Sequence, residues 1–357
     1  MAFFEKERDL NRPPEDLILE VDGSFFQAKA SEWTLRLDQF LAAHLTWRSR
    51  SSVRDLVKDG FVELDASTPD QPLGSGKFVP EKRPGKKLRH GSKVRVIIPP
   101  HLRLPVPEGV SAIEVLYEDD DVTAVEKPAM VPVHPSGRYV NDTLIQRLHG
   151  HYAEQLTQEG VAPRLAHRLD RETSGIVLVG RRPGAHTELR RQFEAGEIDK
   201  RYLAIVEGVI EADRGSLNWP IGPARTSVIR LKMTVCEDGL DARTDWSVVE
   251  RFDDVTLVAC ELFTGRQHQI RVHLSAMGHP IVGDKLYGPD EEIFARAADG
   301  ELTDQDRDLL RLDRQALHHT RVAFDQPRTG ERIVVESPLA ADLQAFLDGC
   351  SRAGDAS

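Results

Sequence analysis

The chain has 357 residues, of which 40% are hydrophobic and 29% are charged, and its formal net charge is −11. This composition is ordinary for a globular protein and excludes collagen-like, coiled-coil and wholly disordered chains. No apolar run approaches the roughly 18 residues that a membrane helix needs, and the length predicts two or three domains.

Two features of the sequence predict a cytoplasmic setting. The N-terminal stretch MAFFEKERDLNRPPED carries acids and prolines where a signal peptide needs a basic and then an apolar stretch. The three cysteines, Cys236, Cys260 and Cys350, lie far apart and match no metal-binding spacing. We therefore expect a reducing environment and no cysteine-based metal site.

The first hundred residues are expected to form an extension, 1–30, and a small domain, 31–100. The extension has one strand-like run, at 17–22. The predicted elements of the domain are a helix at 34–45, a helix at 49–60 that Gly60 ends, and strands at 61–65 and 93–100. The first helix has an apolar face of Leu37, Phe40, Leu41 and Leu45.

This small domain is basic although the whole chain is acidic. Between Lys77 and Arg95, eight Lys or Arg stand against one acid, Glu81, and several prolines and glycines predict an exposed loop. Residues 31–100 carry 13 basic and 8 acidic side chains, a net charge of +5.

A proline-punctuated linker, 101–110, precedes a larger domain, 111–350. Its β-rich runs are IEVLYEDDDVTAVEKP, GIVLVGR, RYLAIVEGVI, TDWSVVERF, VTLVACEL, TRVAFDQP and ERIVVESP. Helices are predicted at 185–195, 266–277 and 339–348. Strands without regular βαβ alternation predict an α+β fold with a mixed, mostly antiparallel sheet. An acidic segment, 290–308, has a net charge of −6 and is expected to be a solvated surface insertion.

The stretch 163–181 places a polar cluster before a short apolar strand. Asp170 stands there among arginines, which keep a carboxylate ionised by lowering its pKa. An ionised carboxylate suits a nucleophile or an electrostatic stabiliser. The alternative is a surface ion-pair turn that leads into a strand.

A second cluster lies at 262–288, where Gln269 and His273 share one helix face. Arg271 would need a carboxylate partner if buried, and Asp170 is the candidate. His268 and His273 are five residues apart, a poor spacing for two ligands on one helix, so no metal is expected.

Two more stretches allow a structural or a functional interpretation. Tyr202 lies in a strand-like pattern at 200–208 and is either a core tyrosine or a site residue. The Pro-rich turn at 125–137 is either a rigid loop or the wall of a cleft. The chain has no GxxxxGK[ST], GxGxxG or GxSxG pattern, which argues against a nucleotide cofactor and an α/β-hydrolase.

Taken together, these stretches resemble one family. HRLDRETSG at 167–175 resembles the HRLDxxTSG signature of the RluA-type pseudouridine synthases, and KRYLAIVEG at 200–208 resembles their KxYxAxVxG motif. TGRQHQIRVHL with GHPIVGDKLYG resembles their third block, and EKPAMVPVHPS resembles the segment that opens their catalytic domain. The stretches 242–252 and 316–331 also fit, and the matches follow the family order over about two thirds of the chain. Met130 stands where many relatives have a small residue, and we expect local repacking there.

Residues 34–98 resemble the small RNA-binding module of ribosomal small-subunit protein four. RLDQFLA, then SRS, then a strand after Gly60 match its layout, but a basic insertion, 65–90, replaces the usual turn after the first strand. The RNA contacts expected from this module are Arg36, Arg48, Arg50, Lys58, Lys86 and Lys87.

The resemblance implies a catalytic domain with a central cleft and Asp170 as the catalytic aspartate. In the reaction, the bond between the sugar and a uracil nitrogen breaks, the uracil rotates, and a bond to its carbon five forms. Nothing is oxidised or transferred, so no cofactor is expected. Attack on the sugar, attack on the base and removal of a sugar proton all remain open as the role of the carboxylate.

The resemblance also assigns roles to three neighbours of Asp170. Tyr202 stacks on the target base and takes part in the final proton removal, and Arg271 pairs with Asp170. Arg168 enters the RNA stack when the target leaves it, because flipping a base costs roughly a few kcal/mol and leaves a gap.

The expected partner is RNA, which the basic module and its linker would tether to the catalytic cleft. Ribosomal RNA is favoured over transfer RNA because of the module, and a monomer without membrane contact is expected. An RNA-binding or ribosome-assembly factor without catalysis, and a hydrolase built on the His/Asp/Arg cluster, are the alternative functions.

Overall fold

A computed structural model gives the structure of the chain and describes residues 16–21, 35–45, 50–71, 74–97, 112–134, 142–159 and 162–352. The predicted linker at 101–110, Arg48 and the side chain of Arg50 lie outside the described residues. None of the helices in the described ranges combines the length and apolarity needed to cross a bilayer.

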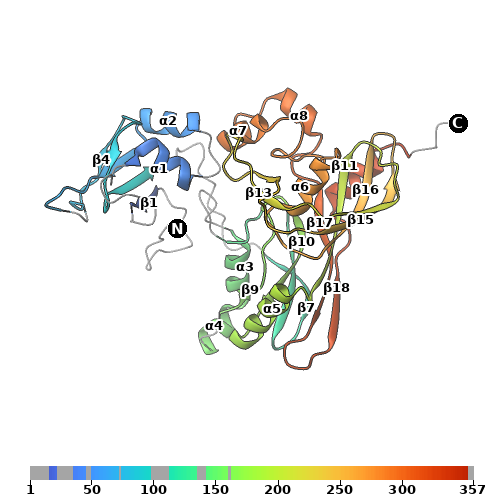
Figure 1. Cartoon of the computed structure of the whole chain (residues 1–357). Helices are drawn as coiled ribbons and strands as arrows, with labels where there is room; N and C mark the ends of the chain where they lie inside the picture. Colours follow the sequence, from blue (N-terminus) through green and yellow to red (C-terminus); the bar gives the residue numbers. More distant parts are fainter. Residues whose placement is uncertain are drawn as a thin grey trace.

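The N-terminal part forms a small lobe, which Figure 1 shows apart from the large sheet. Its elements are β1 (Asp16–Glu20), β2 (Leu35–Arg36), α1 (Leu37–His44), α2 (Arg50–Lys58), β3 (Val62–Asp65), β4 (Val79–Pro80), β5 (Lys87–Leu88) and β6 (Lys93–Ile97). One sheet has the strand order β1-β6-β3-β4, and β2 pairs with β5. The predicted helices and strands are therefore present, and the basic segment contains two short strands beside its loops.

The spacing of the apolar residues explains which side chains of this lobe are buried. All four residues of the predicted apolar face of α1 are buried, and β6 turns Val94 and Val96 inward while Lys93 and Arg95 stay partly exposed. The basic insertion is tied down by buried Asp65, whose carboxylate accepts hydrogen bonds from the backbone N–H groups of Ser75 and Gly76.

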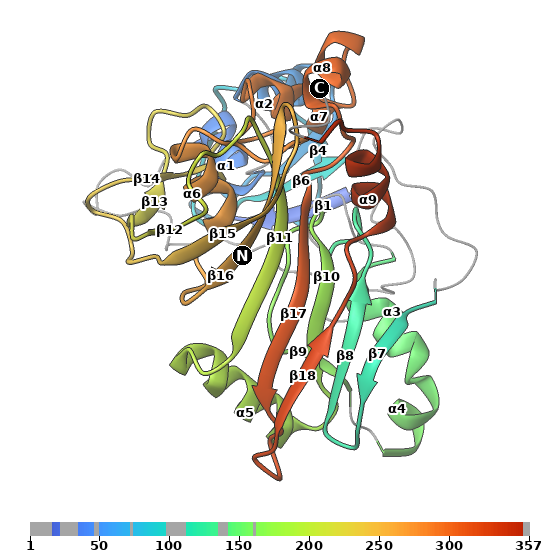
Figure 2. The same cartoon turned by 90° about the vertical axis from the view of Figure 1, so that its right-hand side faces the viewer.

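The larger part is built on one sheet of ten strands. They are β7 (Glu114–Glu118), β8 (Val122–Lys127), β9 (Arg164–Leu165), β10 (Ser174–Gly180), β11 (Asp199–Glu207), β12 (Arg214–Leu217), β15 (Thr244–Arg251), β16 (Val255–Leu262), β17 (Leu317–Asp325) and β18 (Arg332–Glu336). The order is β12-β15-β16-β11-β17-β10-β8-β7, with β18 beside β17 and β9 beside β10. Figure 2 shows the long strands side by side. Among the described strands of this sheet only β10 and β17 pair in parallel, which confirms the mixed, mainly antiparallel α+β fold.

A separate hairpin joins β13 (Ile221–Pro223) to β14 (Met233–Val235). The helices of this part are α3 (Leu144–His151), α4 (Ala153–Glu159), α5 (Pro183–Ala195), α6 (Gln269–Ala276), α7 (Glu292–Asp299), α8 (Asp304–Leu310) and α9 (Ala341–Asp348). Local signals set several ends: a Thr143–Gln146 capping box begins α3, and Pro183 and left-handed Gly196 bound α5.

Strand β10 lies at the centre of the core, and all seven of its residues are buried. Its alternate side chains enter two hydrophobic clusters, because successive residues of a strand face opposite sides. Ile176 packs in the cluster that includes Leu189 of α5, and Val177 packs in the cluster that includes Leu144 of α3.

The glycine at the start of β10 lets two strands approach closely. Gly175 has φ +113°, and a Cβ atom there would lie 2.4 Å from the carbonyl oxygen of His319 on β17. This close approach fixes the end of the loop that carries Asp170, because Gly175 pairs directly with His319.

Two predictions made from periodicity and charge need correction. Helix α6 begins at Gln269 rather than at 266, because His268 takes a left-handed backbone conformation with φ 58°. The acidic segment is not merely a solvated insertion, because it forms α7 and α8. Asp306 is buried there and binds the Arg296 guanidinium, with Nη2 2.7 Å from Oδ1.

Candidate functional site

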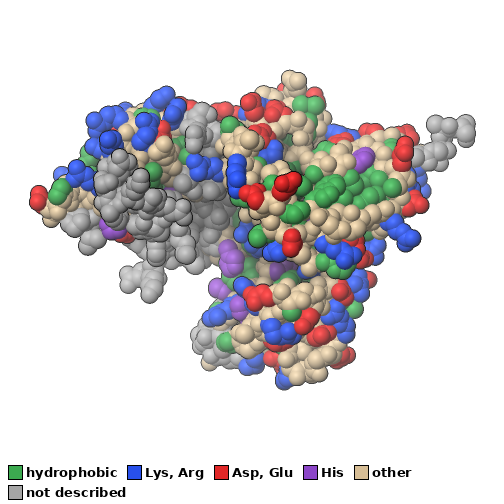
Figure 3. Space-filling model, viewed as in Figure 1, with side chains coloured by type: hydrophobic (Ala, Val, Ile, Leu, Met, Phe, Trp, Pro, Cys, Tyr) green, Lys and Arg blue, Asp and Glu red, His purple; other side chains and the backbone are tan. Residues whose placement is uncertain are grey.

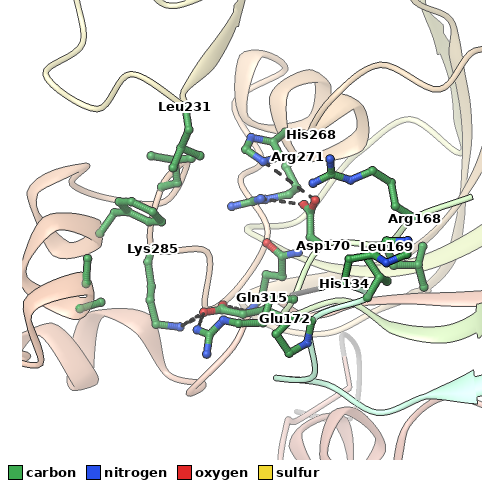
Figure 4. Close-up of a pocket in the computed structure, with 17 residues that line it drawn as sticks. His134, Arg168, Leu169, Asp170, Glu172, Leu231, His268, Arg271, Lys285 and Gln315 are labelled. Carbon is green, nitrogen blue, oxygen red and sulfur yellow. Dashed lines mark hydrogen bonds and ion pairs between the residues drawn. The ribbon is translucent and has the colours of Figure 1, made fainter. Parts of the chain in front are cut away.

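A hollow of about 270 Å³ is lined by Asp170, which lies in the loop between β9 and β10. The wall includes Pro132, Val133 and His134 of the predicted Pro-rich turn, which therefore does line a cleft. The opposite wall is apolar and includes Leu231, with Phe294 and Ala297 of α7. Figure 4 shows His268, Arg271 and Arg168 around the carboxylate of Asp170, with Lys285 on the side of Leu231.

The predicted ion pair between Asp170 and Arg271 is present, with Nη1 2.8 Å from Oδ2. Arg271 has a second carboxylate partner, because its Nε and Nη2 donate to the two oxygens of Asp284 at 2.7 and 2.9 Å. Burial alone would raise the pKa of Asp170, but the charges of His268, which is protonated in the acid range where Asp170 titrates, and of Arg271 outweigh it and lower this pKa to about 2. Asp170 is therefore ionised at neutral pH, and its side chain remains 25% exposed to the hollow.

His268 lies on the other side of the same carboxylate. Its Nε2 is 3.9 Å from Asp170 Oδ1, and its Nδ1 is 2.8 Å from the hydroxyl of Tyr287. That hydroxyl accepts the backbone N–H of Met233, so its own hydrogen is available to Nδ1. This arrangement favours the tautomer with the ring proton on Nε2. Burial lowers the pKa of His268 to about 4, so the ring is neutral at pH 7.

A buried lysine anchors the loop that carries Asp170. Lys127 of β8 donates to three backbone carbonyls, those of Pro128, Val131 and Arg171, at 2.8, 3.0 and 3.1 Å. An ammonium group has three donors, and here each has an acceptor. Burial lowers the pKa of Lys127 to about 7.

A second set of contacts holds the next residues of this loop. Lys285 donates to both carboxylate oxygens of Glu172 at 3.1 and 3.0 Å and to the carbonyl of Asp313. The side-chain amide of Gln315 donates to Thr173 Oγ1 at 2.6 Å. The loop is thus held from β8, from the turn after α6 and from the segment before β17.

Tyr202 does not line the hollow of Asp170 but a neighbouring hollow of about 560 Å³, and Arg168 lines both. One face of the Tyr202 ring stacks on His319 with a centroid distance of 4.4 Å. Burial and the charge of Asp170 raise the pKa of Tyr202. Figure 4 shows the Arg168 guanidinium directed towards the Asp170 carboxylate.

Four of the basic residues predicted to contact RNA have described side chains in the N-terminal lobe: Arg36, Lys58, Lys86 and Lys87. Arg36 and Lys87 are cross-strand neighbours in β2 and β5, and Arg36 pairs with Asp38. Lys58 pairs with Asp55 at the end of α2. Figure 3 shows Lys and Arg side chains gathered over this lobe.

Several buried partners in the site were not predicted from the sequence: Asp284, Lys285, Gln315 and Lys127. The sequence did contain a signal for a second acceptor such as Asp284. A buried Arg271 has five N–H donors, which is more than the single carboxylate of Asp170 can accept. Gln269 and His273 do share a face as predicted, and both contact Thr244 Oγ1, at 3.0 and 2.9 Å.

The arrangement supplies an ionised, partly exposed carboxylate whose position is fixed. Arg271 occupies Oδ2, and among the described residues no donor lies within hydrogen-bond distance of Oδ1. Such an oxygen suits attack on an electrophilic carbon or removal of a proton.

Comparisons with known proteins agree on one family. Residues 121–276 match the family model described as RNA pseudouridylate synthase. The chain is 35% identical to "Uncharacterized RNA pseudouridine synthase YlyB" of Bacillus subtilis over 94% of its own length and 99% of that protein's. It is 36% identical to "Ribosomal large subunit pseudouridine synthase D" of Nitrosomonas europaea, over 88% and 83% of the two chains. The solved structure of "Human RNA Pseudouridylate Synthase Domain Containing 1" superposes with a TM-score of 0.54 and 28% identity, over 69% of this chain and 91% of that one.

Proposed function

The chain belongs to the RNA pseudouridine synthase family, and we propose that it isomerises uridine in ribosomal RNA with Asp170 as its catalytic carboxylate. One observation carries the role of Asp170: its ionised carboxylate lies in the hollow with one oxygen bound by Arg271 and the other open. The proposed substrate is supported by the relative named as a ribosomal large subunit enzyme and by the basic N-terminal lobe.

The product is an isomer of the substrate. The bond from C1′ of the ribose to N1 of the uracil breaks, the uracil turns, and C1′ bonds to C5. The hydrogen on C5 leaves as a proton, and N1 gains one. Asp170 acts through Oδ1 by attack on the sugar or on the base, in which case the bond that it forms breaks again before the product leaves, or by removal of a sugar proton that it later returns.

The neighbouring groups keep this oxygen reactive. Arg271 fixes the carboxylate and keeps it ionised, so no proton must leave before the first step. The neutral ring of His268 brings an N–H group within 3.9 Å of Oδ1 without neutralising the carboxylate. In this proposal the target base stacks on Tyr202, which lines the adjoining hollow, and Arg168, which lines both hollows, takes the place of the base in the RNA.

The test is a map of pseudouridine in ribosomal and transfer RNA from cells that lack this chain. The cells are complemented with the wild-type chain, Asp170→Asn or Asp313→Asn, the last being a control at a side chain that is 95% exposed. We expect one or a few ribosomal RNA sites to disappear and to return with wild type and Asp313→Asn only.

Two outcomes would contradict the proposal. Sites that return with Asp170→Asn would remove Asp170 from its catalytic role, since an amide is neither a nucleophile nor a base of comparable strength. If sites are lost only from transfer RNA, the substrate is transfer RNA and not ribosomal RNA. This result would not contradict the catalytic role of Asp170.

A further inference from the structure

The larger hollow beside the catalytic one has a distinctly basic wall. It is formed by the loop before β10, the end of α5, the start of β11 and the loop after β16. Its charged side chains are Arg168, Arg190, Lys200, Arg266 and one acid, Glu194, which pairs with Arg190. The hollow adjoins the catalytic one, because Arg168 lines both.

Lys200 is the unusual member of this wall. Strand alternation places it on the same face of β11 as Tyr202, and only 9% of its surface is exposed. Among the described residues it has no hydrogen-bond acceptor and no carboxylate within 4.0 Å. The ring of Phe193 lies 5.8 Å from its Nζ. The carboxylate of Asp199, next to it in the chain, is paired with Arg332.

The other two buried lysines among the described residues, unlike Lys200, have hydrogen-bond partners. Lys127 has three carbonyl acceptors, and Lys285 has a carboxylate and a carbonyl. A buried cation without a partner is costly, and burial indeed lowers the pKa of Lys200. Lys200 lines the hollow, and a poorly partnered cation at the wall of a cleft is a candidate contact for an anionic ligand.

We propose that this hollow binds a phosphodiester group of the substrate RNA beside the flipped uridine, with Lys200 as its central contact. This inference rests on the proposed function for the identity of the anion. A nucleotide that leaves its stack carries its flanking phosphates to the rim of the catalytic hollow, and the adjoining basic hollow lies there. Phosphate contacts of this kind position RNA without reading its sequence.

The test compares Lys200→Met, Lys200→Arg and Arg201→Gln in the full chain. Methionine removes the charge and keeps the length of the side chain, and arginine keeps the charge. Arg201 is an exposed, matched control on the opposite face of the same strand. The probe is unmodified large-subunit ribosomal RNA transcribed in vitro, and the affinity is measured across a series of salt concentrations.

We expect Lys200→Met to bind this RNA about tenfold more weakly, as for a lost charged hydrogen bond. The slope of log affinity against log salt should fall by about 0.7–0.9, the value for one phosphate contact. Lys200→Arg and Arg201→Gln should keep the wild-type slope. Free of RNA, Lys200→Met should be at least as stable to heat as wild type, because it removes an unpaired buried charge.

Two results would overturn the inference. One is a Lys200→Met protein with wild-type affinity and salt slope. The other is a Lys200→Met protein that melts well below wild type, which would make Lys200 a structural residue. Turnover of the same RNA by wild type separately tests the proposed function, since a wild-type chain that binds but forms no pseudouridine leaves the binding comparison intact.

Discussion

Arg271 divides its donors between two carboxylates, and this division fixes the direction of the proposed catalytic group. Its Nε and Nη2 face Asp284, so that Nη1 is left for Asp170. Asp284 is fully buried and also accepts the backbone N–H groups of Leu286 and Tyr287. Because a guanidinium is planar, a fixed Asp284 sets the plane in which Nη1 meets Asp170.

We expect Asp284→Asn to slow catalysis by up to about 10²-fold, since an amide accepts from Arg271 through one oxygen and a small displacement of a reacting group has an effect of this size. The free energy of unfolding should fall by about 3 kcal/mol, because the variant leaves part of a buried charge uncompensated. Single-turnover rates and urea denaturation measure the two effects. Asp313→Asn is the exposed control, and a wild-type rate in Asp284→Asn would refute the positioning role.

For single residues, the sequence predicts an ion pair where a buried charge needs a partner of opposite sign. Asp170 and Arg271 could be paired because a buried arginine needs a carboxylate and the resemblance supplied one. Lys285 and Glu172 could not be paired, because they are 113 residues apart and meet only when the turn after α6 packs on the loop before β10.

Helices and strands were predictable where periodicity alone decides them. The run GIVLVGR at 175–181 predicts a strand, and β10 covers 174–180, whereas the start of α6 depends on one left-handed residue, His268, that no local pattern marks. The acidic segment was misjudged because charge counting ignores its apolar side chains. Phe294 and Ala297 of α7 line the hollow of Asp170, whereas five of the eight acids of the segment are exposed.

A buried chain of hydrogen bonds joins four elements behind the site. Ser174 of β10 contacts His318 Nδ1 on β17 at 2.9 Å, His318 Nε2 contacts Ser337 after β18 at 3.1 Å, and Ser337 donates to Glu126 of β8 at 2.7 Å. Burial raises the pKa of Glu126 to about 7. Ionisation of Glu126 therefore changes the hydrogen bonds at the junction where β8, β10 and β17 meet.

Glu126 makes the stability of this junction depend on pH. Its pKa is higher in the folded chain than in the unfolded chain, so its contribution to stability is full below about pH 4.5 and is lost as the pH rises through about 7. Glu126→Gln should therefore gain stability relative to wild type between pH 5 and pH 8, by roughly 1–3 kcal/mol. Urea denaturation at several pH values measures this difference.

The control is Glu261→Gln, at an exposed glutamate of β16, whose stability relative to wild type should not change with pH. A stability difference for Glu126→Gln that stays constant with pH would contradict the role of Glu126 ionisation.

Over the whole molecule, charge and hydrophobic packing separate the same two parts of the chain, the N-terminal lobe and the larger part. One hydrophobic cluster draws only on residues 17–96, and the others draw on residues from 122 to 347. The segment around the first cluster is basic in an otherwise acidic chain. We infer that the N-terminal lobe holds RNA by its phosphates, while the chemistry takes place on the large sheet.

This division predicts that binding and chemistry can be separated. Replacing both Lys86 and Lys87 of the lobe by Gln should lower the slope of log affinity against log salt by about 1.4–1.8, the value for two phosphate contacts. The single-turnover rate at saturating protein should stay that of wild type, because neither residue lies near Asp170 in the chain or lines its hollow. A matched control removes Arg328 and Arg352, two exposed cations of the larger part that line neither hollow, and should leave the slope unchanged. A Lys86/Lys87 variant with an unchanged slope would mean that this part of the lobe does not touch phosphate. One that loses rate even at saturation would mean that the lobe also aligns the target uridine in the catalytic hollow.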